Sequence, residues 1–144
     1  MLLIMNKENI KKYIKLFTEL TPDKIVLFDD LIDKNIVFID PFNNVKGSEN
    51  FKKIFHHMFK KVKNPKFSIL DFSIGKKNAY LKWEMSFKAF NSNQKIEGVS
   101  EIILNKNGKI CSHIDYWDSL NGLFIKLPFI GVLYRLSLRL FSDS

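Results

Sequence analysis

Two stretches of the chain combine residue types that could move protons. Asp40 precedes Pro41 at the end of a short β-branched run, while His113, Asp115 and Trp117 alternate along a later run. Because strand residues two apart point to the same side, the last three share one face of their strand. A carboxylate beside an imidazole can orient the ring and hold it ready to exchange a proton. Acid-base catalysis is therefore the first chemistry to consider.

Each of these residues also has a purely structural interpretation. An Asp-Pro step commonly initiates a turn, so Asp40 could serve only to accept backbone N–H bonds. His113 and Asp115 could form a satisfied polar pair in a half-solvated strand, and Asp118 could cap the segment that follows. The sequence leaves the catalytic and the structural interpretations open.

Other reactive residue types give weaker signals. His56 and His57 are adjacent on a predicted helix, so they diverge by about 100° and cannot converge on one metal ion. Cys111 is the only cysteine, which excludes an intramolecular disulfide. No base that would activate its thiol is visible, and we expect it to fill the core. No motif suggests a metal or an organic cofactor, so we expect neither.

The elements that must position these residues follow from the spacing of apolar residues. Helical spacing predicts amphipathic helices over about 6–20 and from Ser48 to about 62, the later one being the longest. Between them a helix should begin at Thr21 as its N-cap and run to about Leu31. A turn over 33–35 and a short strand over 36–39 complete the first half.

The second half changes to a period of two, typical of strands with one buried face. The apolar members of the clearest run are Leu81, Trp83, Met85 and Phe87. Turn signals at 75–78, 91–93 and 105–108 divide this half into four strands. Their expected ranges are about 67–74, 79–90, 95–104 and 109–118. Helices followed by a strand meander predict an α+β fold with the helices on one face of a sheet.

Composition limits the class of protein and its partners. The chain has 144 residues, 46% of them hydrophobic, and is expected to fold as one domain spanning 1–144. The net charge is +8, but the lysines are scattered, which favours a solvated surface over nucleic-acid binding. A single cysteine and the lack of an export signal at the N-terminus favour a cytoplasmic location.

The region 120–141 is predicted to be an amphipathic, helical C-terminal tail interrupted by Pro128. Arg135 and Arg139 lie four residues apart on one side of its second part. These charges exclude a membrane-spanning helix. We expect the tail to pack against protein, and peripheral contact with an anionic membrane is the alternative.

The order helix, helix, short strand ending in Asp-Pro, helix and four-strand meander resembles the nuclear transport factor two superfamily. The stretches 38–47, 107–110 and 113–117 resemble its ketosteroid isomerase-like and SnoaL-like branch in particular. The resemblance covers about residues 6–120. It implies a cone-shaped, curved and mostly antiparallel sheet, a cystatin-like α+β barrel, packed against three N-terminal helices around one apolar pocket.

The resemblance also implies roles for individual residues. Asp40 takes the place of the base that moves a proton beside a substrate carbonyl, with His113 and Asp115 as its proton partners. Ser100 falls where the isomerase has its oxyanion-hole acid, and Tyr13 lies one turn from the place of the isomerase's tyrosine. The residues expected to contact the substrate are Tyr13, Phe42, Trp83, Ser100 and Trp117.

Two classes of function follow. The first is a cofactor-independent isomerase, lyase or cyclase acting on an apolar carbonyl compound. The second is a non-catalytic module of the same fold that binds a small ligand or associates with protein, which the missing oxyanion pair favours. Epoxide hydrolysis, which in this superfamily uses an Asp-Arg-Asp set, is weaker because the only arginines are Arg135 and Arg139. The resemblance implies a homodimer as the common assembly.

Overall fold

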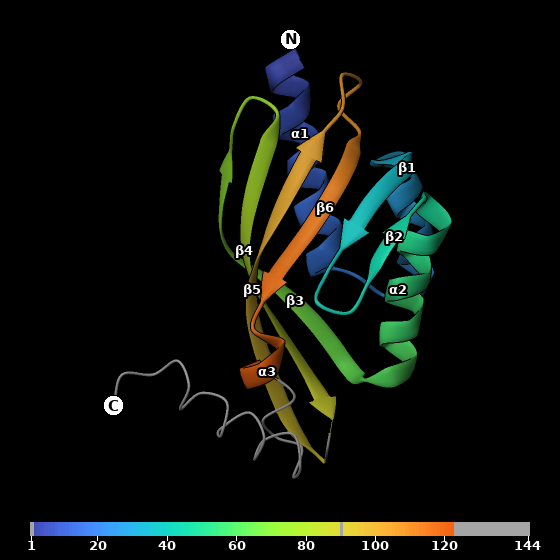
Figure 1. Cartoon of the computed structure of the whole chain (residues 1–144), viewed down its shortest axis with the longest axis vertical. Coiled ribbons are helices and arrows are strands. Elements are labelled where there is room, and N and C mark those ends of the chain that lie inside the picture. The colour runs from blue at the N-terminus through green and yellow to red at the C-terminus, as the bar shows by residue number, and fades with distance from the viewer. Residues whose placement is uncertain (1, 90, 123–144) are drawn as a thin grey trace.

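The computed structural model describes residues 2–89 and 91–122 (Figure 1). Its helices are α1 (Leu2–Thr18), the 3₁₀-helix η1 (Pro22–Asp30), α2 (Ser48–Lys61) and the single-turn α3 (Ser119–Gly122). Its strands are β1 (Ile32–Ile39), β2 (Asn44–Lys46), β3 (Lys63–Ile74), β4 (Asn78–Ala89), β5 (Ser92–Leu104) and β6 (Ile110–Trp117). The chain has the α+β organisation that its sequence predicts.

All six strands belong to one curved, unclosed sheet in the order β2-β1-β6-β5-β4-β3. The strands from β3 to β6 form the predicted meander of antiparallel neighbours. Strand β1 pairs in parallel with β6 and antiparallel with β2, so the sheet is mostly antiparallel. The ends of β1 and β6 are thereby placed side by side, as Figure 1 shows.

The helices cover the inner face of the sheet. In Figure 1, α1 lies behind the strands, while α2 lies beside β1 and β2. Helix α2 follows its predicted stripe, with Phe51 and Phe55 buried and Lys53, Lys60 and Lys61 exposed. Lys52 is instead largely covered and pairs with Asp29 and Glu49. Phe17, Phe28 and Phe38 pack with them at ring-centroid separations between 5.0 and 5.9 Å. This group of phenylalanines fills the space between the helices and the sheet.

Several predicted boundaries are corrected by the structure. Helix α1, with 17 residues, is longer than α2, with 14. The helix after Thr21 is a 3₁₀-helix, and the Thr21 side chain makes no capping bond because its hydroxyl binds the Asp23 carboxylate instead. Gly47, at φ 97°, occupies the N-cap position of α2, and Ser48 is the first helical residue. Glycine adopts this backbone conformation without strain.

The expected turn over 33–35 is part of β1. Its signal has a local cause, because the Asn35 N–H donates to the Asp33 carboxylate at 2.7 Å, as in an Asx-turn. The ladder between β1 and β6 is irregular over the same stretch, between the pairs Ile32 with Ile110 and Val37 with Ser112. The additional strand β2 lies in the region of turn formers. The predicted tail beyond residue 122 lies outside the described residues.

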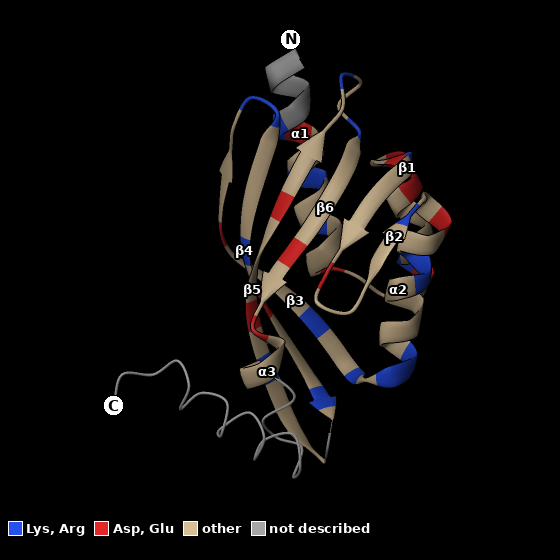
Figure 2. Ribbon diagram, in the orientation of Figure 1, with Lys and Arg blue, Asp and Glu red and all other residues tan. Residues whose placement is uncertain are grey.

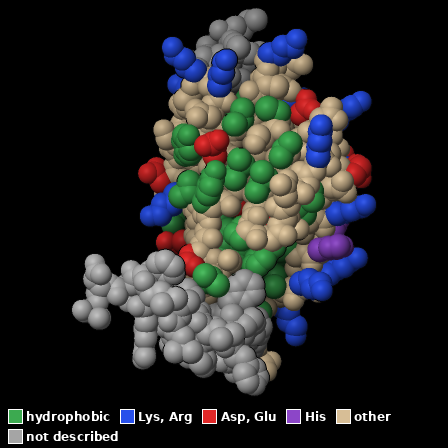
Figure 3. Space-filling view, in the orientation of Figure 1, with side chains coloured by type: hydrophobic (Ala, Val, Ile, Leu, Met, Phe, Trp, Pro, Cys, Tyr) green, Lys and Arg blue, Asp and Glu red, His purple; other side chains and the backbone are tan. Residues whose placement is uncertain are grey.

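The outer face of the sheet carries exposed apolar side chains (Figure 3). Tyr116 is 59% exposed, and it pairs across the strands with Val99, which is also exposed. Tyr80, on β4, adds a second exposed ring. Charged residues are spread over the described chain, as Figure 2 shows. No helix within the described residues is long and apolar enough to span a membrane.

Candidate functional site

A cavity of about 1060 Å³ lies between α2 and the inner face of the sheet. Its wall is mainly apolar and includes Phe38, Ile54, Met58, Met85, Phe87 and Ile96. Two carboxylates line it, those of Asp40 and Asp115. The volume is at the upper end of the range for small-molecule sites, and an apolar wall with a few polar groups is their usual composition.

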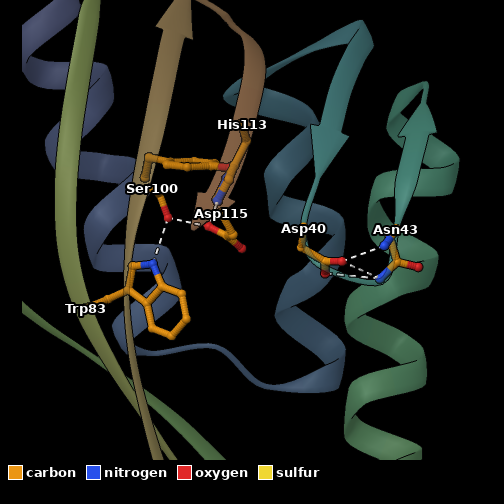
Figure 4. A network of polar contacts seen from close by, with 7 residues as sticks. Asp40, Asn43, Trp83, Ser100, His113 and Asp115 are labelled. Atoms are coloured by element: carbon orange, nitrogen blue, oxygen red, sulfur yellow. Dashed lines mark hydrogen bonds and ion pairs between the residues drawn. The ribbon is translucent and has the colours of Figure 1, made fainter. Parts of the chain in front are cut away.

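The register between β1 and β6 brings the two carboxylates to one cavity. Phe38 is paired with His113 and Ile39 with Ile114, so Asp40 follows the end of β1 at the level of Asp115. Figure 4 shows the Asp40 carboxylate turned toward Asn43, while the Asp115 carboxylate lies on the side of His113 and Ser100. Asp40 and Asp115 therefore line the same cavity, whereas His113, which was predicted to converge with them, lines only a smaller cavity beside Ser100.

Asp115 belongs to a chain of hydrogen bonds that leads into the protein core (Figure 4). His113 Nε2 lies 2.7 Å from Asp115 Oδ1, and His113 Nδ1 lies 2.7 Å from the Tyr13 hydroxyl. On the other side, the Ser100 hydroxyl binds Asp115 Oδ1, and Trp83 Nε1 donates to Ser100 Oγ at 2.8 Å. Four side chains from α1, β4, β5 and β6 therefore hold one carboxylate in place.

Trp83 determines the direction of this chain. An indole N–H can only donate, so Ser100 Oγ accepts from Trp83 and its own hydrogen is free to be donated to Asp115. With Asp115 ionised, His113 Nε2–H supplies a second donor, and Nδ1 then accepts from the Tyr13 hydroxyl. This arrangement satisfies each member, and Asp115 Oδ1 accepts two of the bonds. Figure 4 shows the second carboxylate oxygen pointing away from Ser100, toward the Asp40 side.

The buried environment keeps Tyr13 neutral. Burial first, and the negative charge of Asp115 second, raise the pKa of the Tyr13 hydroxyl well above its usual value. A neutral phenol is the form that donates to the His113 imidazole. Tyr13 packs edge-on against His113 and Phe17 in the core, so its hydroxyl meets His113 and does not line the cavity. Its contribution to the site therefore passes through His113.

Asp40 is engaged in a different way. Its Oδ1 accepts the backbone N–H groups of Phe42, at 2.8 Å, and Asn43, at 2.6 Å. The Asn43 side-chain amide lies 3.0 Å from both carboxylate oxygens, as the dashed lines in Figure 4 indicate. These donors fix the turn between β1 and β2. Asp40 thus holds its turn, as its structural interpretation expects, and also lines the cavity.

Three aromatic residues predicted to contact a substrate line the cavity. Phe42 and Trp117 meet edge-to-face with ring centroids 5.6 Å apart, and Phe42 is 52% exposed. Trp83 is buried, with its N–H bound to Ser100. Ser100 lines a smaller cavity of about 30 Å³ beneath Asp115, which has room for about one water molecule.

Gly98 is a residue of the site that sequence reasoning missed. A Cβ at this position would lie 2.4 Å from Trp83 Cζ2 and 2.9 Å from Trp117 Cβ. The absence of a side chain therefore allows Trp83 to cross strand β5 and reach Ser100. An isolated glycine inside a strand signals such a close approach and could have pointed to it.

The other reactive residues lie apart from this network. His56 and His57 are both exposed, and His57 lines the cavity without joining the network. Within residues 2–89 and 91–122, no group of three or more His, Cys, Asp or Glu side chains is placed to hold a metal ion. Cys111 is partly buried, and its thiol binds the Ile103 carbonyl at 3.4 Å. Asp118 accepts the Asn121 N–H at 3.0 Å, which confirms that it caps the segment after β6.

A curved mostly antiparallel sheet, helices on its inner face and an apolar cavity between them define a class of small α+β pocket proteins. The sequence profile of the SnoaL-like domain matches residues 10–113, and the chain belongs to that family. No curated protein matches the sequence.

Solved structures agree with this assignment at the level of the fold. A candidate SnoaL-like polyketide cyclase from Jannaschia sp. superposes with a TM-score of 0.70 and 13% identity, covering 82% of this chain and 88% of its own. A ketosteroid isomerase-like protein from Catenulispora acidiphila, in complex with trimethylamine, gives 0.68 and 13%, with 83% and 91% covered. An NTF2-like protein of unknown function from Exiguobacterium sp. gives 0.66 and 18%, with 76% and 98% covered.

Proposed function

We propose that the cavity binds a mostly apolar carbonyl compound and transfers a proton beside its carbonyl group, as isomerases, lyases and cyclases do. The observation that carries this proposal is that two carboxylates, Asp40 and Asp115, line one apolar cavity while buried His113 and Tyr13 support one of them. Positioned carboxylates beside an apolar ligand are the usual means of general acid-base catalysis. The membership in the SnoaL-like family and the candidate cyclase among its structural neighbours support the same class of chemistry.

In the proposed step, Asp40 takes a proton from the carbon beside the carbonyl group. The His113–Asp115 pair, after taking one further proton from water, supplies it to the carbonyl oxygen, so that an enol forms. Return of the oxygen proton to the pair, and of the Asp40 proton to a carbon, completes an isomerisation or an exchange with solvent. Ser100 and Trp83 hold Asp115 at the cavity while the proton moves. No step requires a group other than these side chains and water.

Proton exchange into deuterated water tests this proposal. We would screen apolar enones and polyketide-like carbonyl compounds with the native protein, Asp40→Asn and Asp115→Asn. Each substitution should slow exchange by roughly a hundredfold to ten-thousandfold. Asp71→Asn on β3 is the matched control, because Asp71 is exposed and does not line the cavity. Exchange that is equally fast in all four proteins would refute the mechanism.

A binding module is the second candidate, and the hydrogen bonds of Asp40 favour it. Three N–H groups already bind this carboxylate, so it can act as a fixed negative charge beside Phe42 and Trp117. Carboxylates with aromatic rings are the usual surroundings of alkylammonium ligands, and one structural neighbour holds trimethylamine. Calorimetry with trimethylammonium tests this candidate. Binding that Asp40→Asn abolishes, in a protein that exchanges no carbonyl α-protons, would favour it over catalysis.

We also propose that the whole chain, 1–144, is one domain that works as a cytoplasmic homodimer. The exposed apolar side chains of Tyr80, Val99 and Tyr116 on the outer sheet face support self-association, because such patches on soluble proteins commonly mark interfaces. Light scattering of the native protein and of Tyr116→Lys, which should be monomeric, tests the dimer. Co-sedimentation with anionic vesicles, before and after truncation at residue 121, tests membrane contact by the 120–141 tail.

A further inference from the structure

Three lysines line the solvent-exposed part of the cavity. Lys61 ends α2, Lys63 begins β3 and Lys88 lies near the end of β4. All three residues are exposed, as are the neighbouring lining residues 91–93. We call Lys61, Lys63 and Lys88 the lysine rim.

The rim contains an arrangement that folding alone does not favour. Lys63 and Lys88 are directly paired across the antiparallel strands β3 and β4. Like charges at directly opposed positions repel each other and destabilise a strand pair. The next lysine of β4, Lys82, is instead paired with Asp71, of opposite charge. An anion between Lys63 and Lys88 would relieve the repulsion.

The three rim lysines have no acidic partner among the described residues, in contrast to three other described lysines, Lys24, Lys52 and Lys95. Lys52 pairs with Asp29 and Glu49, and Lys95 pairs with Glu84. Within the described residues, none of the three rim lysines makes an ion pair. The acidic groups that line the cavity are Asp40 and Asp115, on the β1 and β6 side of it. Helix α2 supplies one further reason for a positive charge at Lys61, because cations stabilise helix C-termini. That reason does not apply to Lys63 or Lys88.

We propose that the lysine rim is an anion subsite, and that the cavity takes amphiphilic ligands with an apolar body and a carboxylate, phosphate or sulfonate group at the rim. The apolar body occupies the wall formed by residues such as Met58, Met85 and Phe87. The inference rests on the proposed function only in placing the substrate in the same cavity. It specifies a substrate whose acidic group lies at the opposite side from Asp40 and Asp115.

Two matched fluorescent probes test the subsite. 8-Anilinonaphthalene-1-sulfonate carries a sulfonate, whereas N-phenyl-1-naphthylamine has the same ring system without it. Both tryptophans, Trp83 and Trp117, line the cavity, so energy transfer from tryptophan to the probe reports binding. The native protein should bind the sulfonated probe more tightly than the uncharged probe. A higher salt concentration should weaken the binding of the sulfonated probe only.

The rim variant carries the substitutions Lys61→Gln, Lys63→Gln and Lys88→Gln. It should bind the sulfonated probe about tenfold more weakly than the native protein, because each exposed charge pair contributes modestly. Binding of the neutral probe should not change. The control variant Lys12→Gln, Lys53→Gln, Lys82→Gln removes the same charge from exposed positions that do not line the cavity.

Equal loss in the rim and control variants would overturn the subsite, because net charge alone would then explain the effect. An equal loss of affinity for both probes in the rim variant would also overturn the subsite. The same holds if the uncharged probe fails to displace the sulfonated probe, because the two probes would then bind at different places. Competition experiments on the native protein then identify the preferred head group. The competitors are decanoate, decyl phosphate and decanol, which share one chain length. The two acidic competitors should displace the probe and decanol should be weaker. These binding results do not depend on proton exchange, so a failure of the proposed catalysis would be seen separately.

Discussion

Replacing Gly98 with alanine should disrupt the site, although Gly98 does not itself line the cavity. The new Cβ would lie 2.4 Å from Trp83 Cζ2 and 2.8 Å from Cη2, where ordinary contacts begin at 3.4 Å. The indole must therefore move by about 1 Å, and it is a rigid ring in a packed environment. Overpacking of this kind costs about 1–3 kcal/mol. Movement of the ring also breaks the bond from Trp83 Nε1 to Ser100, which adds about 1 kcal/mol.

Thermal unfolding measures this effect. A loss of about 2–4 kcal/mol corresponds to a fall in Tm of roughly 5–12 °C for a domain of this size. The indole N–H resonance of Trp83 should shift at the same time. Gly75→Ala is the control, because its Cβ would come closest to the flexible end of the Asn78 side chain and would meet backbone only at 3.3 Å, so its Tm should fall less than that of Gly98→Ala. An unchanged Tm and an unshifted Trp83 resonance in Gly98→Ala would refute the claim that Gly98 positions the indole.

Three further predictions concern single side chains. Tyr13→Phe leaves His113 Nδ1 without its donor, so urea unfolding at pH 8 should show a loss of about 1–3 kcal/mol. Because the pKa of Tyr13 is raised in the folded protein, native stability should fall as pH rises above about 10, and this fall should be smaller in Tyr13→Phe. Asn43→Ala removes the amide bonds to Asp40 and should cost about 1 kcal/mol in the same assay, whereas no loss would contradict its role in the turn. Burial raises the pKa of the Cys111 thiol, so iodoacetamide at pH 7.5 should alkylate it at least about tenfold more slowly than in unfolded protein, and equal rates would contradict this.

Much of the fold could be predicted because the periodicities are strong. The alternation through Leu81, Trp83 and Met85 identified β4 and its buried face. The apolar stripe of α2 was equally clear. The region 32–46 was harder, because β1 pairs in parallel with β6, far along the chain, and its polar stretch forms a local bond typical of a turn. Long-range pairing of this kind leaves no local signal in the sequence.

The candidate site was predictable in its residues and less so in its connections. Alternation placed His113, Asp115 and Trp117 on one face, which is the inner face of β6. The bond from Trp83 to Ser100 joins residues 17 positions apart on neighbouring strands, and depends on a register that the sequence does not reveal. The role of Gly98 depends on the same register. Tyr13 was expected to contact a substrate, whereas its hydroxyl lies behind His113.

The most direct test of the account is the protonation of the His113 ring at pH 7, measured by ¹⁵N NMR of histidine-labelled protein. The directions of the bonds from Trp83 to Ser100, and from Ser100 to Asp115, predict a proton on Nε2 facing Asp115. Nδ1 should be unprotonated and accept from Tyr13, so that Tyr13→Phe moves the Nδ1 resonance most. This result would show an ionised Asp115 held at the cavity by an imidazole N–H. A neutral ring protonated on Nδ1, with a proton on Asp115 instead, would contradict the account.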